Sequence, residues 1–226
     1  MNNSYDFYGQ FTPPVDQYLF TNWPYLAEKS QGYIIEAGAL DGITECSTYF
    51  FEKYFQRRVI NIEPDPVWFS RLTINRPSAI NLNFALSNNS GTLDFTRVIH
   101  PEIGDRLGHG SIQHKRKHLN YLKNINCQFI NTPVQAITYA QVIHNLKIDR
   151  VDLMVLDVEG HEVSVIKGFR DTDYKSLPAI LCVEVGWTSL LECRILLKRF
   201  GYSFHSKHEV NAFFVNNKLL KVIKND

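Results

Sequence analysis

The sequence has no long hydrophobic run, no large excess of either charge and no cysteines in paired spacing. No segment reaches the roughly 18 continuous apolar residues that a membrane span needs, and no apolar stretch follows a basic start at the N-terminus. A net charge of +1 produces no strong field for nucleic acid. The four scattered cysteines indicate a reducing compartment. We therefore expect a soluble, cytoplasmic protein with no membrane span and no nucleic-acid partner.

The length and composition suit one α/β domain that spans residues 1–226, because 226 residues with 44% hydrophobic content are enough for a full core. Residues 1–32 are aromatic and polar, and we expect an N-terminal cap with a short helix at Val15 to Phe20. Tyr8-Gly9-Gln10 suits either a turn or a ligand contact. The sequence leaves the oligomeric state open, and a homo-oligomer is compatible with it.

The chain is organised around Y-I-I-E-A-G-A-L-D-G, from Tyr33 to Gly42. It predicts a buried parallel strand and a glycine loop, followed by a helix from Thr44 to Phe55. Such units bind nucleotide-like ligands. Two carboxylates in the loop would repel a diphosphate but suit the ammonium and sulfonium of S-adenosylmethionine. A tight turn with solvated acids is the alternative. We assign to the cofactor Glu36, Gly38, Asp41 and Gly42.

A second predicted strand, Arg58 to Ile62, ends at Glu63. In a doubly wound sheet the acid that closes the second strand accepts hydrogen bonds from a ribose, and Glu63 follows Asp41 by 22 residues, near the expected separation of about 20. We predict that Glu63 binds the ribose. The alternative is a helix-capping acid, a role that Asp65 fits better, before a helix from Val67 to Asn75.

A third predicted strand, Ile80 to Leu86, is followed by a turn and by Thr92 to Val98, which alternates like a hairpin partner. Phe84 and Ala85, near the end of the third strand, should flank the adenine. Phe84 also suits a plain core position.

Residues 100–126 depart from the regular pattern, and glycines loosen the first half of this segment. It also contains several lysines and four histidines, which are His100, His109, His114 and His118. We expect a lid insertion that closes over an anionic substrate such as a nucleotide sugar. The segment could instead form a solvated basic surface or a metal site. For a metal site, only His114 and His118, on one helix face, have suitable spacing.

Val151 to Gly168 is the second informative stretch. A buried strand delivers Asp157 at its carboxyl end, and the chain turns at Gly160 into a helix. Because ligands sit at the carboxyl ends of such strands, Asp157, Glu159 and His161 should crowd the site predicted from Gly38. Glu159 and Glu162 also suit the first turn of a helix, where acids are stabilised by the dipole.

A neighbouring predicted strand, Ala179 to Val185, ends at Glu184. Asp157 and Glu184 on adjacent strand ends could share one Mg²⁺ or Mn²⁺, which prefers oxygen ligands. We treat this metal as optional. The tail predicts a helix from Ser189 to Phe200 and a terminal hairpin that makes the last two strands antiparallel.

For a sulfonium methyl donor we expect an in-line displacement in which an acceptor atom of the substrate attacks the methyl group. His161 is our first choice of base, because an unperturbed histidine titrates near pH 6.5. We count Asp157 and Glu159 with it as catalytic. His161 could instead cap its helix or pack.

Taken together, these motifs resemble the FkbM family of S-adenosylmethionine-dependent methyltransferases. The motifs that carry the resemblance are E-A-G-A-L-D-G, I-E-P-D-P, N-F-A-L-S with G-T-L-D-F, and V-D-L-M-V-L-D-V-E-G-H-E with I-K-G. Tyr8-Gly9-Gln10 is similar to the family's N-terminal Gln motif, which assigns Gln10 to the cofactor. Residues 100–126 match poorly.

The resemblance implies a Rossmann-like class I fold with a seven-stranded, mostly parallel sheet, an antiparallel last strand and helices on both faces. It also implies O-methylation of a sugar hydroxyl, with a sugar or nucleotide sugar as substrate in surface polysaccharide synthesis such as that of capsule or lipopolysaccharide. An N-methyltransferase, a natural-product methyltransferase and a module that binds the adenosyl ligand without turnover remain open.

Overall fold

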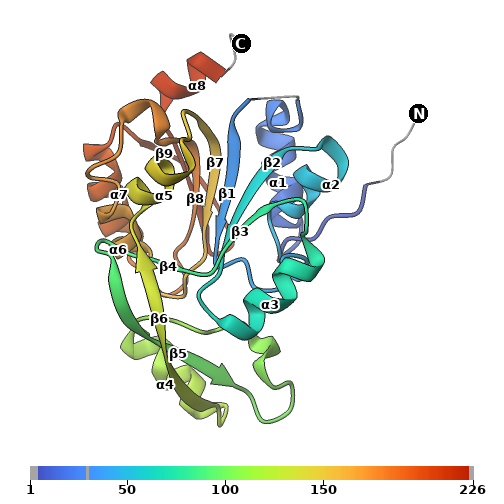
Figure 1. Ribbon diagram of the computed structural model, residues 1–226, viewed down its shortest axis with the longest axis vertical. Coiled ribbons are helices and arrows are strands. Elements are labelled where there is room, and N and C mark those ends of the chain that lie inside the picture. The colour runs from blue at the N-terminus through green and yellow to red at the C-terminus, as the bar shows by residue number, and fades with distance from the viewer. Residues whose placement is uncertain (1–4, 29–30, 224–226) are drawn as a thin grey trace.

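A seven-stranded sheet forms the centre of the molecule in the computed structural model, which describes residues 5–28 and 31–223 (Figure 1). Its strand order is β3-β2-β1-β7-β8-β10-β9. The five strands from β3 to β8 run parallel, and β10 runs antiparallel to both of its neighbours. This sheet confirms the predicted fold class. The strands are β1 (Tyr33–Ala37), β2 (Arg58–Ile62), β3 (Ile80–Leu82), β7 (Val151–Leu156), β8 (Pro178–Glu184), β9 (Ser203–His208) and β10 (Asn211–Val215).

Helices cover both faces of this sheet (Figure 1). Short 3₁₀ turns lie at Pro24–Ala27, Asp105–Leu107 and Tyr174–Ser176. None of the helices in the described residues has the length and apolarity that a membrane crossing needs. The helices are α1 (Val15–Asn22), α2 (Tyr49–Phe55), α3 (Pro66–Asn75), α4 (Arg116–Asn124), α5 (Tyr139–Leu146), α6 (Glu162–Lys167), α7 (Leu190–Arg199) and α8 (Asn217–Ile223).

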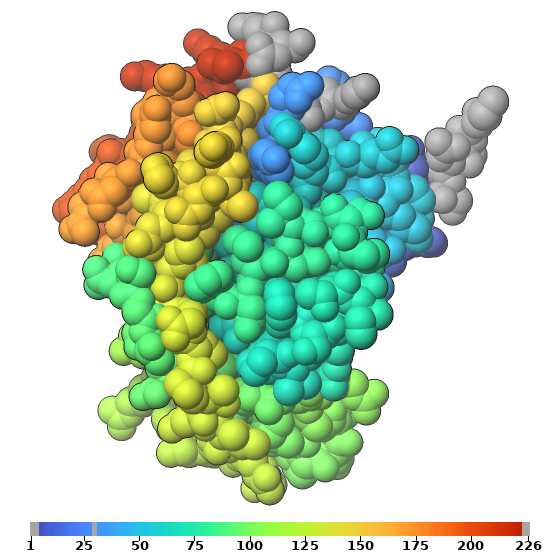
Figure 2. Space-filling view, viewed as in Figure 1, coloured from blue at the N-terminus to red at the C-terminus, as the bar shows by residue number. Residues whose placement is uncertain are grey.

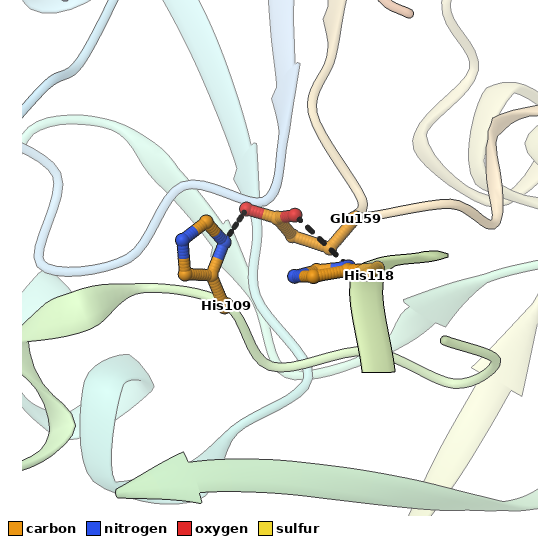
Figure 3. Close-up of side chains that lie close together, drawn as sticks. All are labelled: His109, His118 and Glu159. Carbon is orange, nitrogen blue, oxygen red and sulfur yellow. Dashed lines mark hydrogen bonds and ion pairs between the residues drawn. The ribbon is translucent and has the colours of Figure 1, made fainter. Parts of the chain in front are cut away.

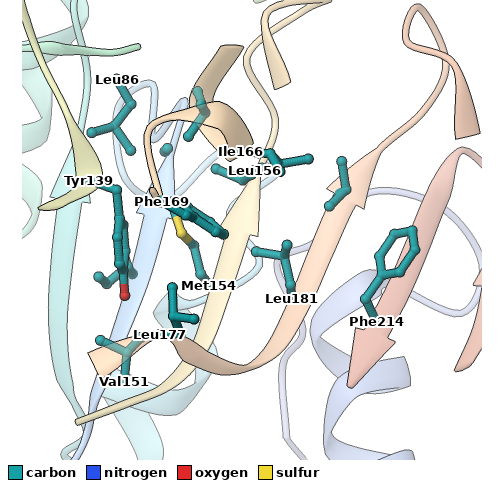
Figure 4. Packing of buried hydrophobic residues seen from close by; sticks show 14 of the residues in the cluster. Leu86, Tyr139, Val151, Met154, Leu156, Ile166, Phe169, Leu177, Leu181 and Phe214 are labelled. Carbon is teal, nitrogen blue, oxygen red and sulfur yellow. The ribbon is translucent and has the colours of Figure 1, made fainter. Parts of the chain in front are cut away.

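The core divides into two layers because successive side chains of a strand point to opposite faces. In β1, Ile34 packs with α1 and α2, whereas Ile35 packs with α5, α6 and α7. Leu153 and Met154 of β7 divide in the same way. Figure 4 shows the second layer, where Tyr139 of α5 and Ile166 of α6 lie over the sheet. Continuous apolar strands such as β7 are therefore buried on both faces, as the sequence predicted.

Two sequence predictions about the region after β2 were wrong. The predicted third strand divides, since Ile80–Leu82 joins the main sheet while Ala85–Leu86 (β4) joins a second sheet. Gly91–Ile99 (β5) is not the hairpin partner of that strand but pairs antiparallel with Gln128–Ile137 (β6). A nine-residue ladder satisfies far more backbone groups of β5 than the short third strand could. Alternation alone does not reveal a strand's partner.

The helix after β1 was also predicted too long, because it begins at Tyr49 rather than Thr44. The preceding residues instead form a loop that bonds to the carboxylate of Glu36. Of the predicted N-terminal cap, residues 1–4 and 29–30 lie outside the described residues, and α1 confirms its short helix.

The predicted lid insertion, residues 100–126, lies with β5 and β6 at the end of the molecule opposite the C-terminus (Figures 1 and 2). Its helix α4 exposes Arg116 and Lys117 to solvent and buries His118 and Leu122. It therefore has a basic outer face and an apolar inner one. Because α4 begins at Arg116, His114 precedes the helix and does not share a helix face with His118.

Candidate functional site

A cavity of about 270 Å³ lies at the carboxyl ends of β1, β2 and β7. Its opposite wall comes from the second sheet and from the loop around His109. Nine of the residues that the sequence assigned to the site line this cavity. They are Gln10, Glu36, Gly38, Glu63, Phe84, Ala85, Asp157, Glu159 and His161.

Gly38 brings the ends of two strands into direct contact. Its φ of +86° lies in the left-handed region, and a Cβ at this position would lie 1.8 Å from the carbonyl oxygen of Asp157. The amide of Asp157 donates to the carbonyl of Ala37 at 3.0 Å, and the amide of Gly38 donates to Ile62 at 3.0 Å. Only glycine allows this approach, which places the loop against both β2 and β7.

Glu36, in β1, holds the loop that borders the cavity. Its carboxylate accepts hydrogen bonds from the Ser47 amide at 2.8 Å, from Thr48 Oγ1 at 2.6 Å and from Cys46 Sγ at 2.7 Å. These bonds satisfy a buried charge that would otherwise be costly. The side chain thus positions the loop as well as lining the cavity.

Glu63 follows β2 and links two loops. It accepts hydrogen bonds from the Leu40 amide at 2.9 Å and from the Asp65 amide at 2.8 Å. Burial raises the pKa of Glu63 to about 8. Asp65 accepts from the Val67 amide at 2.8 Å and so caps α3, which confirms that Asp65, rather than Glu63, is the helix-capping acid.

Asp157 stands at the end of β7 among other acids. Burial, and then the charges of Glu159 and Glu184, raise its pKa well above the usual range. Within the described residues, no ion pair joins Glu63 or Asp157 to a lysine or arginine. A cationic ligand would therefore relieve the repulsion at this end of the cavity.

His161 lies just before α6 without capping it. Its Nε2 is 3.0 Å from Ser87 Oγ, and its Nδ1 has no hydrogen-bond partner among the described residues. Burial, helped by the charge of Lys115, lowers its pKa to about 4. The imidazole is therefore neutral near pH 7 and has a free nitrogen.

Glu159 makes contacts that the sequence did not indicate (Figure 3). Its Oε1 lies 2.9 Å from Nδ1 of His109, and its Oε2 lies 3.7 Å from Nδ1 of His118. Burial alone would lower the pKa of His109, but the hydrogen bond and charge of Glu159 leave it raised. Reasoning from sequence missed His109, whose flanking glycines signalled only a loose loop.

Three predicted site residues do not line the cavity. The Asp41 carboxylate accepts from the amides of Ile43 and Thr44, at 2.9 and 2.7 Å, and so turns toward its own loop. Gly42 packs against Leu72 and Arg76 instead. These contacts correct the expectation that Asp41 faces the methyl donor S-adenosylmethionine.

Glu184 also stays outside the lining, and its Oε1 accepts from the Gly186 amide at 2.9 Å. The charge of Glu184 contributes to the raised pKa of Asp157. Because only Asp157 lines the cavity, the structure gives the predicted metal pair no support.

Comparison with known proteins gives a consistent picture. The FkbM methyltransferase domain matches residues 36–204, more than half of the chain. Methyltransferase sdnD of Sordaria araneosa is 26% identical over 177 residues, which cover 69% of this chain and 66% of that protein. The solved FkbM methyltransferase of Methylobacillus flagellatus aligns with a TM-score of 0.53 and 17% identity, over 83% of this chain and 44% of that one.

The chain thus spans about two thirds of the length of its curated relative and less than half of the solved one. The class I methyltransferase fold implies S-adenosylmethionine as the cofactor, and the acidic lining of the cavity fits that cation. On the domain match and the strand order together, the chain belongs to the FkbM family of methyltransferase domains.

Proposed function

We propose that this protein is an S-adenosylmethionine-dependent O-methyltransferase that acts on a sugar hydroxyl. The observation that carries the proposal is the cavity at the strand ends, where the buried acids Glu36 and Glu63 and the half-buried Asp157 have no basic partner in the described ion pairs. In this proposal Glu63 accepts hydrogen bonds from the ribose hydroxyls and Phe84 and Ala85 contact the adenine, which is supported by their position in the lining of the cavity.

When bound, S-adenosylmethionine supplies an electrophilic methyl group on its sulfonium. Glu36, Glu63 and Asp157 would hold this donor. Nδ1 of His161 would take the proton of the acceptor hydroxyl as the methyl group is transferred and S-adenosylhomocysteine leaves. His161 suits this role because it is neutral near pH 7 and its Nδ1 is free. Its second nitrogen is held by Ser87, which orients the ring.

The acceptor class follows from the basic groups near His161. Lys115 packs against Gly160 and adds positive charge beside His161. Arg97, on the second sheet, also lines the cavity, where its Nε donates to Asp65 at 2.6 Å and its Nη1 and Nη2, which make no hydrogen bond within the described residues, are the groups left for an acceptor. These cations suit a phosphorylated acceptor, so we propose a nucleotide sugar of surface polysaccharide synthesis.

Calorimetry with S-adenosylhomocysteine tests the cofactor part of the proposal. We expect binding by the wild type and at least about tenfold weaker binding by Asp157→Asn, since one lost charge-assisted contact is worth about 1.5 kcal/mol or more. His144→Ala, at an exposed position of α5, serves as a control and should bind normally. An absence of binding by the wild type would remove the proposal.

Transfer of a labelled methyl group tests the acceptor. Nucleotide sugars, free sugars and amines are offered in parallel, and mass spectrometry locates the new methyl. We expect a methyl ether on the nucleotide sugar and a fall in kcat of about 10²-fold or more for His161→Ala, with unchanged affinity for S-adenosylhomocysteine. Methylation of the amines alone would overturn the choice of oxygen.

A further inference from the structure

Three side chains from distant parts of the chain meet at the wall of the cavity. His109 comes from the loop after β5, His118 from α4 and Glu159 from the loop after β7. One potential ligand atom from each lies within 4.8 Å of the other two. Figure 3 shows the carboxylate between the two imidazoles, with one oxygen toward each ring.

Several polar atoms of these three side chains make no hydrogen bond within the described residues. His118 is fully buried, and neither of its ring nitrogens has a hydrogen-bond partner among the described residues. Its ring stacks on Trp187 with the ring centroids 4.1 Å apart and the planes 3° apart, so the orientation is fixed by packing. In the same part of the chain that the structure describes, Oε2 of Glu159 is buried without a hydrogen bond. Unsatisfied buried polar atoms are unfavourable, and a ligand at this point would satisfy them.

The backbone conformation of Glu159 is a second, independent observation that favours a ligand at this position. Its φ is +55°, in the left-handed region that is unfavourable for a residue other than glycine. Glu162 supports that loop by accepting from the Val158 amide at 3.2 Å and the Gly160 amide at 3.0 Å. The fold thus holds Glu159 in a strained position between two histidines.

We propose that His109, His118 and Glu159 bind a divalent transition metal ion of the Zn²⁺ class. Two imidazole nitrogens and one carboxylate form the donor set of catalytic zinc sites, which keep a fourth position for water or substrate. Mg²⁺ prefers oxygen donors and suits this set poorly.

The distances from Glu159 to the two histidines agree with this assignment. Bonds of about 2.0–2.1 Å in tetrahedral geometry place neighbouring ligand atoms about 3.3 Å apart. The Glu159–His109 and Glu159–His118 separations, 2.9 and 3.7 Å, lie on either side of that value. Binding requires the Nε2–H tautomer of His109, so that Nδ1 can exchange its contact with Glu159 for the metal.

The location connects the ion to the cavity, because His109 and Glu159 both line it. The site differs from the oxygen-only pair Asp157 and Glu184 that the sequence suggested. The proposed metal site also does not depend on the proposed acceptor, because metal binding is measured without methyl transfer. A failure of the sugar assay would therefore leave this inference standing, and the reverse also holds.

The test uses the untagged full chain after treatment with a chelator. Zn²⁺ is titrated by calorimetry, metal content is measured by mass spectrometry, and Co²⁺ serves as a spectroscopic probe. We expect one ion per chain, a raised melting temperature and a visible Co²⁺ spectrum without thiolate charge transfer. That last feature separates the site from the four buried cysteines.

Variants of the ligands decide the assignment. Changes in the groups around a metal site weaken binding by 10–100-fold, so loss of a direct ligand should weaken it by more than about 100-fold. We expect this for His109→Ala and Glu159→Gln, and His118→Ala is compared only if circular dichroism shows a native fold. His144→Ala is the matched control on an exposed helix surface. Undiminished binding by His109→Ala and Glu159→Gln, or no stoichiometric binding by the wild type, would overturn the proposal.

Discussion

At the scale of single residues, a few side chains and one glycine determine how the strand ends meet. Gly38 lies where β1 touches the carbonyl of Asp157, and Glu36 and Glu63 fasten the loops on either side. Both carboxylates accept from backbone amides, and the Gly38 amide donates to the Ile62 carbonyl, which keeps the loop in one conformation. The site therefore depends on close backbone contacts, which a change of side-chain rotamer cannot restore.

Replacing Gly38 by alanine should separate the two strand ends. The left-handed φ costs about 1–2 kcal/mol, and the contact at 1.8 Å with Asp157 forces an additional shift of backbone. We expect a loss of several kcal/mol in the free energy of unfolding, measured with urea. Gly104→Ala is the control, since it shares a positive φ of 66° but has open space around it. Equal losses in both variants would contradict the role given to close packing.

Several of these residues were predictable from sequence and others were not. Glu63 and Asp157 end apolar strands, so a local pattern located them correctly at the cavity. Asp41 stands in the same loop as Gly38 but bonds to the amides that follow it, because a short acid near a turn competes for its own backbone. Sequence pattern does not distinguish these two outcomes.

At the scale of elements, the second sheet and α4 form a small unit with its own apolar clusters. Val98, Leu122 and Cys127 pack together, apart from the two layers of the main sheet. The unit nevertheless supplies one wall of the cavity. A small cluster stabilises its elements less than a large core does, so this unit should open more readily.

Leu122→Ala tests that expectation. Removal of a fully buried leucine costs about 2–5 kcal/mol, and here the loss should be local to the small cluster. We expect faster amide exchange in α4, β5 and β6, with β7 and β8 still protected. Leu181→Ala, in the main core, should instead raise exchange throughout. Uniform loss of protection in Leu122→Ala would show that the two parts unfold together.

At the scale of the whole molecule, the acids at the strand ends make stability depend on pH. Burial raises the pKa of Glu63 to about 8, and burial with nearby carboxylates raises that of Glu184 to about 8, from 4.5. Between pH 4.5 and about pH 8, Glu63 and Glu184 of the folded protein keep protons that the unfolded chain has released. Their contribution to stability is therefore complete below pH 4.5 and is lost as pH rises through 8.

For the ligand-free protein we accordingly predict a melting temperature that falls between pH 5 and 8, where these acids contribute. One pKa unit corresponds to about 1.4 kcal/mol, so the decline should reach a few kcal/mol. Glu63→Gln removes one of the titrating groups and should flatten the curve, while Glu28→Gln, at an exposed position, should leave it unchanged. Parallel curves for the wild type and Glu63→Gln would mean that Glu63 is ionised across this range.

The sequence by itself determined the architecture and the position of the cavity, because strand periodicity, glycine turns and strand-ending acids are local properties. The tertiary structure alone decided the pairing of β5 with β6, the exclusion of Asp41 and Glu184 from the cavity, and the meeting of His109 and His118 with Glu159. These outcomes depend on contacts between residues up to 50 positions apart, as for His109 and Glu159. Such contacts arise from packing, which local patterns do not specify.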